Sequence, residues 1–246
     1  MAAAVGWGAL AASSLVAGAL LAFAREWTPR QTGTVLAFGA GALISAVSFE
    51  LVQEGTETAG LGWVAIGLGV GALTYYLADG AVSDRGSGGR GRAGRTGGEA
   101  AAGGAGTALA LGAFLDGIPE QMVLGIGLAQ GEGVGVGLIV AIFVSNLPEA
   151  IGSANEMRGA GATRKRILRL WVAVAVICLL ATILGFAIAD VASGEGRAVI
   201  NGFAGGALLV MLIDSMVPDA TADAGRIAGL VTVLGFAVAF GLSSLT

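Results

Sequence analysis

The segment "FGAGALISAVSFELVQE" (residues 38–54) is apolar for most of its length and has its acidic residues, Glu50 and Glu54, near its end. A helix needs about 20 apolar residues to cross the ~30 Å hydrocarbon layer of a membrane. The whole chain has the same character, because 55% of its 246 residues are hydrophobic, only 12% are charged and 44 are glycine. Since so few charges cannot cover a soluble domain of this size, the sequence predicts a membrane protein.

Eight apolar stretches predict eight transmembrane helices, because an open strand edge is not stable in lipid. We expect an all-α, polytopic fold that forms a single transmembrane domain over residues 1–246. Glycine lets helix backbones approach closely in membranes, so "GLGVGAL" (67–73) and "GEGVGVGL" (131–138) predict tight helix contacts. The expected spans are about 4–24, 33–53, 60–78, 104–129, 133–156, 168–189, 198–217 and 227–245.

The basic residues predict an orientation in the cell membrane. All but one of the 13 Lys and Arg residues lie in or next to the loops after the first, third, fifth and seventh spans, and the exception is Arg197. By the positive-inside rule these loops are cytoplasmic and both termini lie outside. The cytoplasmic loop 79–103 is rich in Gly and Arg and has no apolar periodicity, so we expect it to be flexible. Topological anchoring explains its arginines, and we expect no nucleic-acid partner.

The opening segment also aligns without gaps on "FAGGALLVMLIDSMVPD" (203–219), with Phe38 opposite Phe203 and Gly41 opposite Gly206. In the predicted topology the two segments run in opposite directions. Inverted repeats are typical of transporters whose substrate site lies near the membrane midplane, between the two halves. We therefore expect two helix triplets around a central pair, a 3+2+3 arrangement. The alternative is chance similarity between apolar helices.

The central pair of helices carries carboxylates within two similar segments, "FLDGIPEQMVLG" (114–125) and "FVSNLPEAIGSA" (143–154). Polar side chains one helical turn apart share a face in each segment, and these are Asp116 with Glu120 and Asn146 with Glu149. An ionised carboxylate at the bilayer centre costs about 2.5–3.5 kcal/mol, so three of them require compensation. We expect protons, water or a bound cation to provide it.

A proline precedes the glutamate in each segment. Pro119 and Pro148 each remove a helical hydrogen bond and free the carbonyl four residues earlier, at Leu115 and Val144. Carbonyls and carboxylates together favour a cation site. Two alternatives stay open: kinked helices whose protonated acids bond to each other, and a carboxylate relay for protons. The chain has no histidine and no HExxH motif, and we expect no enzymatic activity.

These residues resemble a known family. "DGIPEQ" (116–121) and "SNLPEA" (145–150) resemble the His-Asn-x-Pro-Glu-Gly motif on the fourth and fifth helices of the ZIP (Zrt/Irt-like) metal transporters. The eight spans, the outside termini, the long third loop, "ELVQEG" (50–55) and "DSMVPDA" (214–220) are similar to that family too. Most of the chain is covered, but the motif matches are short and both motif histidines are replaced.

The resemblance implies two metal positions, the first formed by Asp116, Glu120, Ser145 and Glu149 and the second by Gly117, Asn146, Glu149 and Ser215. Gly117 and Ser215 carry no charge, so we expect a single metal site. Oxygen donors suit Mn²⁺, Mg²⁺, Ca²⁺ or Fe²⁺, whereas the family resemblance favours zinc. The metal is the transported substrate, and we expect no resident cofactor.

The expected function is import of a divalent metal cation across the membrane. Glu50, near the outer end of its helix, and Asp214, near the inner end of its own, are candidate path residues, together with Ser215 and Gln121. The alternative is a ZIP-derived membrane protein that carries another solute or has a regulatory role without transport. The lipid bilayer and the metal are the expected partners, and a homodimer stays open.

Overall fold

The computed structural model describes residues 1–85, 117–129 and 136–244, which are helical apart from short turns and contain no strand. Asp116 and most of the predicted loop 79–103 lie outside these residues. Residues 117–129 form one helix, and the other elements are α1 (Ala2–Ala24), α2 (Pro29–Ala46), η1 (Val47–Gln53), α3 (Glu54–Ala59), α4 (Leu61–Arg85), α6 (Val136–Gly159), α7 (Arg164–Asp190), α8 (Gly194–Met211), η2 (Leu212–Met216), α9 (Val217–Ala224), η3 (Gly225–Ile227) and α10 (Ala228–Ser243).

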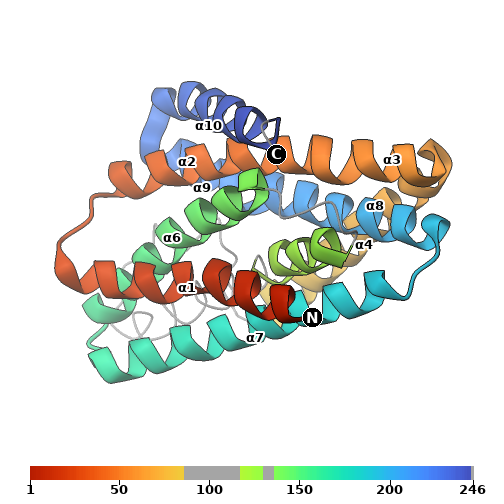
Figure 1. The fold of residues 1–246 in the computed structure, drawn as a ribbon. Coiled ribbons are helices and arrows are strands. Elements are labelled where there is room, and N and C mark those ends of the chain that lie inside the picture. Colours follow the sequence, from red (N-terminus) through yellow and green to blue (C-terminus); the bar gives the residue numbers. More distant parts are fainter. Residues whose placement is uncertain (86–116, 130–135, 245–246) are drawn as a thin grey trace.

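Six helical segments among the described residues are long and apolar enough to cross a membrane. They are Ala2–Ala24, Pro29–Ala59, Leu61–Gly80, Gly137–Gly159, Arg164–Asp190 and Gly194–Ser243. The last has 50 residues, about 75 Å as a straight helix, but it turns back at Gly225 between α9 and α10 (Figure 1). An all-α, polytopic membrane protein is therefore confirmed at this level, and the count of eight spans stays a prediction.

Two long helical segments, α2–η1–α3 and α8–η2–α9, share the same local features. In the alignment of the opening segment, Thr28 is opposite Ser193, and each side chain caps the helix that follows by accepting a hydrogen bond from a backbone N–H in its first turn. Further along, the π-helical segments η1 and η2 begin at the aligned positions Val47 and Leu212. The aligned positions therefore agree in local structure as well as in sequence.

The two segments also end alike. Gly60 and Gly225, again aligned, have φ values of 93° and 64°. A side chain is disfavoured in this region of backbone space, so glycine is the residue that ends each helix. Figure 1 shows that α2 and α8 run in opposite directions, as do α1 and α7. The segments α2–η1–α3 and α8–η2–α9 end at Ala59 and Ala224, beyond the predicted ends at 53 and 217.

Close packing of the helices depends on glycine at several crossings. A Cβ atom at Gly41 of α2 would overlap the Thr232 carbonyl oxygen of α10, and one at Gly206 of α8 would overlap the Leu68 carbonyl oxygen of α4. The predicted contact of the 67–73 segment is confirmed, because a Cβ at Gly71 would lie 2.8 Å from Phe203 Cα. Residues 131–135 of the second predicted glycine segment lie outside the described residues.

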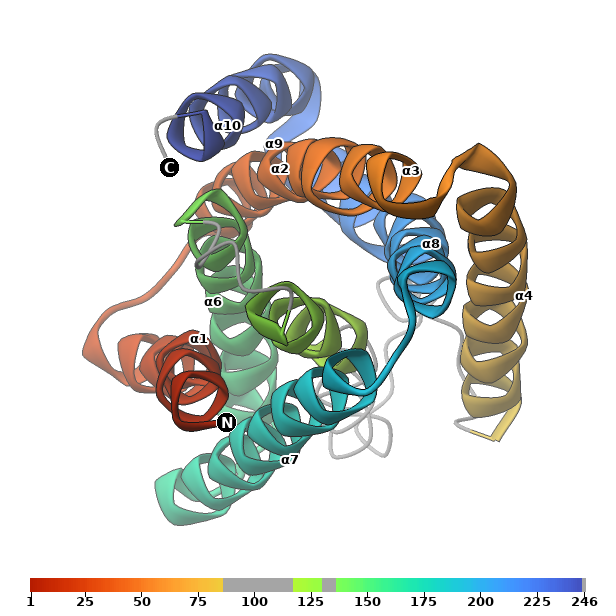
Figure 2. The ribbon, with the colours of Figure 1, turned by 45° about the vertical axis from the view of Figure 1, so that its right-hand side comes forward.

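The helices form two groups. Figure 2 shows α1, α6, α7 and the 117–129 helix on one side and α2, α4, α8 and α10 on the other. Within the first group α1 packs on α6 and α7, and within the second α2 packs on α10 and α4 on α8. α6 packs on α2 and α10 and so connects the two groups. The two segments with the Pro-Glu pattern both lie in the first group.

Candidate metal site

The two Pro-Glu segments meet through a hydrogen bond between Glu120 and Ser145. Ser145 Oγ lies 3.0 Å and 3.2 Å from the two carboxylate oxygens of Glu120 and 3.0 Å from the Ile142 carbonyl oxygen. Glu120 is 1% exposed and Ser145 is fully buried. The hydroxyl has one proton, so Ser145 donates either to the Glu120 carboxylate or to the Ile142 carbonyl.

Two buried amides lie beside this pair. Asn146 and Gln121 are 1% and 0% exposed, and their side-chain NH₂ groups have no hydrogen-bond partner among the described residues. Thr182 Oγ1 of α7 lies 2.6 Å from Gln121 Oε1, which fixes the amide of Gln121 against α7. Oxygen and nitrogen of an amide are assigned from their neighbours, so either amide can present its oxygen after a flip of the group. Both are therefore candidate oxygen donors.

Glu149, one turn after Ser145 on α6, is only partly buried. The carboxylates of Glu120 and Glu149 are close enough to the buried Cys178 thiol of α7 to affect it electrostatically. Gly117 packs against the same thiol, since a Cβ there would lie 2.9 Å from Cys178 Sγ and 4.0 Å from Asn146 Oδ1. The structure thus brings Glu120 and Ser145 into contact where the 117–129 helix meets α6, and it places Gly117 near Asn146. That Asn146 and Glu149 belong to the same site stays a prediction.

The backbone around the site is packed tightly against α2. A Cβ atom at Gly39 would lie 2.9 Å from Ser145 Cα and 3.0 Å from Ser145 N. Glycine at this position therefore lets α2 reach the backbone that carries the site. Pro148 lies inside α6 and has no N–H, so the Val144 carbonyl lacks its usual helical donor one turn before Glu149. This carbonyl is an additional oxygen donor.

The donor set is made of oxygen atoms. Among the described residues, no three His, Cys, Asp or Glu side chains form a metal-binding group. Glu120 and Glu149 are two carboxylates, so a bound cation would need the Ser145 hydroxyl, the Asn146 amide or a backbone carbonyl as well. Asp116, the third predicted carboxylate, lies outside the described residues. Such mixed oxygen sets suit hard dications.

The other predicted path residues lie in the two helical segments that contain η1 and η2, and their place in a transport path stays a prediction. Glu50 lies inside the continuous helical segment Pro29–Ala59 rather than at its end, and its carboxylate is bonded to Ser243 of α10. Asp214 is exposed, whereas its neighbour Ser215 is 8% exposed. Both Glu50 and Asp214 lie within the π-helical segments.

Sequence reasoning missed Thr182 and gave Cys178 no role near the site. Both lie on α7, a helix that is otherwise apolar over its middle turns. The available signal was a polar residue in the middle of an apolar span, since such a group needs a partner inside the protein. The partner itself, Gln121, could not be read from the sequence, because it belongs to another helix.

Comparison with known proteins gives one informative similarity. No family model matches the chain. A curated protein of Arabidopsis thaliana named "Putative zinc transporter" is 28% identical over 210 residues. The match covers 84% of this chain but 33% of the relative, so the chain spans about a third of the relative's length. The similarity extends over most of the helical bundle described above.

Proposed function

We propose that this protein transports a divalent metal cation across a membrane, with the substrate site at Glu120 and Glu149. The observation that carries the proposal is the meeting of two Pro-Glu segments inside an apolar bundle, where Ser145 of one bonds to the buried Glu120 of the other. Carboxylates within the apolar spans of a membrane protein are costly unless a cation or protons neutralise them. The similarity to a protein named as a zinc transporter supports a metal as that cation.

The chemistry of the site favours a hard cation. Glu120 and Glu149 supply the charge, while Ser145, Asn146 and the Val144 carbonyl are neutral oxygen donors within the same two helices. When a cation binds Glu120, the Ser145 hydroxyl has to turn its proton towards the Ile142 carbonyl, which already lies 3.0 Å away. Its lone pairs then face the cation. We infer that Mn²⁺ or Fe²⁺ fits this set at least as well as Zn²⁺, because the donors we assign to it are oxygen atoms.

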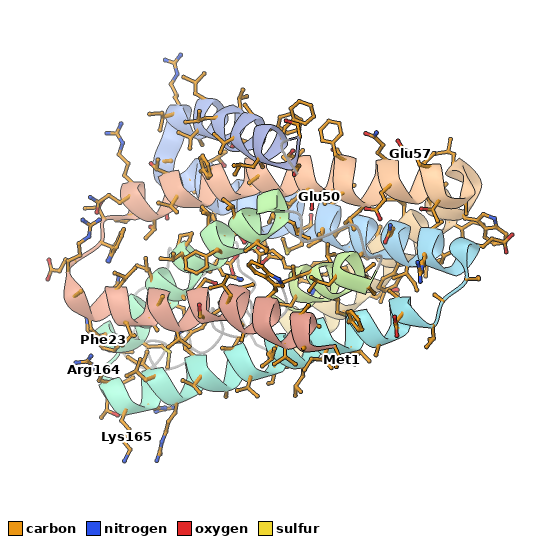
Figure 3. All side chains as sticks on the ribbon, in the orientation of Figure 1. Met1, Phe23, Glu50, Glu57, Arg164 and Lys165 are labelled. Carbon is orange, nitrogen blue, oxygen red and sulfur yellow. The ribbon has the colours of Figure 1, made fainter. Side chains whose placement is uncertain are left out.

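We further infer an inverted repeat of the ZIP type, with eight spans in a 3+2+3 arrangement and both termini outside. Support comes from the aligned caps, π segments and terminal glycines of α2–η1–α3 and α8–η2–α9, and from their opposite directions. Figure 3 shows Phe23, Arg164 and Lys165 at one end of the bundle and Glu57 at the other. The basic end corresponds to the cytoplasmic side in this proposal.

Metal binding should stabilise the purified protein against heat. At a metal concentration of 100 times Kd, binding to the folded state contributes about 2.7 kcal/mol. A chain of this size gains roughly 2–4 °C in Tm for each kcal/mol. We therefore expect a rise of several degrees with Mn²⁺ or Zn²⁺ and uptake of the same ion into proteoliposomes. A Tm that no divalent metal changes, with no uptake above empty liposomes, would contradict the proposed function.

Introducing imidazoles should change which metal is preferred. The double variant Asp116→His and Ser145→His places nitrogen donors where the ZIP motif has histidines, and nitrogen donors favour zinc. We expect the Zn²⁺/Mn²⁺ uptake ratio to rise at least about tenfold, the size of effect that changes around a metal site produce. Competition between the two ions in one proteoliposome assay measures the ratio directly. An unchanged ratio would show that these two positions do not line the site.

A further inference from the structure

Three helices meet at the carboxylate of Glu50, which Figure 3 labels in the middle part of the bundle. Ser243 Oγ, in the last turn of α10, donates a hydrogen bond of 2.5 Å to Glu50 Oε1. The backbone N–H of Leu138, in the first turn of α6, donates to the same carboxylate. Glu50 itself lies in the π-helical segment η1. One side chain thus ties η1 to the end of α10 and to the beginning of α6.

The two hydrogen bonds that Glu50 accepts, from Ser243 and from the Leu138 N–H, are of kinds that contribute more than an average hydrogen bond. The first N–H groups of a helix have no partner within the helix, so a carboxylate that accepts from one of them replaces water there. Hydrogen bonds to an ionised acceptor are also shorter and about twice as strong as neutral ones. Gly137 makes the close approach feasible, because a Cβ there would overlap Ser243 Oγ and lie 3.2 Å from Glu50 Oε1. The three helices therefore form a closed joint around Glu50.

The joint lies between the two helix groups. α6 carries Ser145, Asn146 and Glu149 and belongs to the group of α1 and α7, whereas η1 and α10 belong to the other group. Since α6 packs on α2 and α10, a movement of the site-bearing helices relative to α2 and α10 must change these contacts. At Glu50 such a movement breaks the hydrogen bond from the Leu138 N–H of α6, whereas the bond from Ser243 lies within the second group and holds the carboxylate in position for Leu138.

We propose that Glu50, with Ser243 and the Leu138 N–H, is a latch that holds the two helix groups together in this conformation and opens during transport. This inference rests on the proposed function, because alternating access needs one group to move against the other. It gives Glu50 a mechanical role in place of the ligand role that its sequence position indicated. The latch needs Ser243, whereas cation binding at Glu120 and Glu149 does not involve this residue.

The test uses a reporter cysteine behind the latch. Leu138 is 3% exposed and contributes only its backbone N–H, so Leu138→Cys in a Cys178→Ala background reports whether the joint is open. In detergent without metal, Ser243→Ala should raise the rate of labelling by a charged, hydrophilic maleimide at least about tenfold, as expected for loss of a hydrogen bond to a charged group. Ser244→Ala is the matched control, because Ser244 Oγ donates to Gly241 O of its own helix.

A second variant separates the latch from a general loosening of the protein. Glu50→Gln removes the charge while keeping an oxygen acceptor, and it should also raise the labelling of the reporter cysteine. If both variants break the same joint, the double variant Glu50→Gln/Ser243→Ala should label no faster than the faster single variant. Additive increases, or a Ser243→Ala rate equal to that of Ser244→Ala, would overturn the latch. Uptake by the unmodified protein is measured separately, so its absence counts against the proposed function and not against the joint.

Discussion

Replacing Glu120 or Glu149 with glutamine is expected to reduce metal uptake by at least about 100-fold, since losing even a hydrogen-bond partner of a metal ligand costs roughly 10–100-fold. Glutamine keeps the size of the side chain, and at position 120 it keeps an oxygen that Ser145 can donate to, so the change removes charge and little else. A dication held by two carboxylates loses half of the formal charge that neutralises it. Uptake into proteoliposomes and the metal-dependent rise in Tm measure transport and binding.

The Tm measured without metal distinguishes a variant that has lost the metal site from one that has lost its fold. Glu120 is 1% exposed, and a neutral amide costs less than an ionised carboxylate in an apolar bundle. We therefore expect Glu120→Gln to melt at the same temperature as the parent, or higher, while its metal-dependent rise disappears. Glu26→Gln is the control, because Glu26 is exposed in the turn before α2. Two single variants that transport at the parental rate would remove Glu120 and Glu149 from the site.

The sequence predicted the helices well where lipid determines their length. The expected spans 4–24 and 227–245 agree closely with α1 and α10, because both consist of apolar residues with few interruptions. The ends of α3 and α9 were missed by about two turns, at residues 59 and 224. A helix that leaves the apolar layer continues through polar residues until a residue such as Gly60 or Gly225 ends it. The hydropathy of the sequence therefore does not indicate where such a helix ends.

For the candidate site, the sequence predicted the members on each helix and not the partners between helices. Spacing alone placed Asn146 and Glu149 on one face, because residues three apart on a helix share a side. The bond from Ser145 to Glu120 and the one from Thr182 to Gln121 join different helices, so they depend on packing. The same reason explains Glu50, whose partner Ser243 is close only because α10 packs on α2. The π-helical turns at Val47 and Leu212 leave no apolar pattern of their own.

Substituting alanine at either of two aligned glycines, Gly41 and Gly206, should disrupt the fold strongly. At Gly41 the new Cβ would overlap the Thr232 carbonyl oxygen and approach Phe236 N to 2.8 Å, and at Gly206 it would overlap the Leu68 carbonyl oxygen and approach Ala72 N to 2.9 Å. Backbone atoms cannot move aside by changing rotamer, so whole helices have to separate. Overpacking typically costs about 1–3 kcal/mol and occasionally more, and we expect the upper end of that range at both sites.

The control for this prediction is Gly69→Ala. Gly69 lies on α4, two residues from the close contacts at Gly67 and Gly71, and a Cβ there meets nothing within 4 Å. Alanine is favoured over glycine inside a helix by roughly 0.5–1 kcal/mol, so this variant should melt at the parental temperature or slightly above it. If the inverted repeat builds α2–α10 and α8–α4 in the same way, Gly41→Ala and Gly206→Ala should lower Tm by similar amounts although they disturb different helix pairs. A Gly206→Ala protein as stable as Gly69→Ala would show that the two crossings are not equivalent, and the repeat would then be a similarity of sequence without a shared packing.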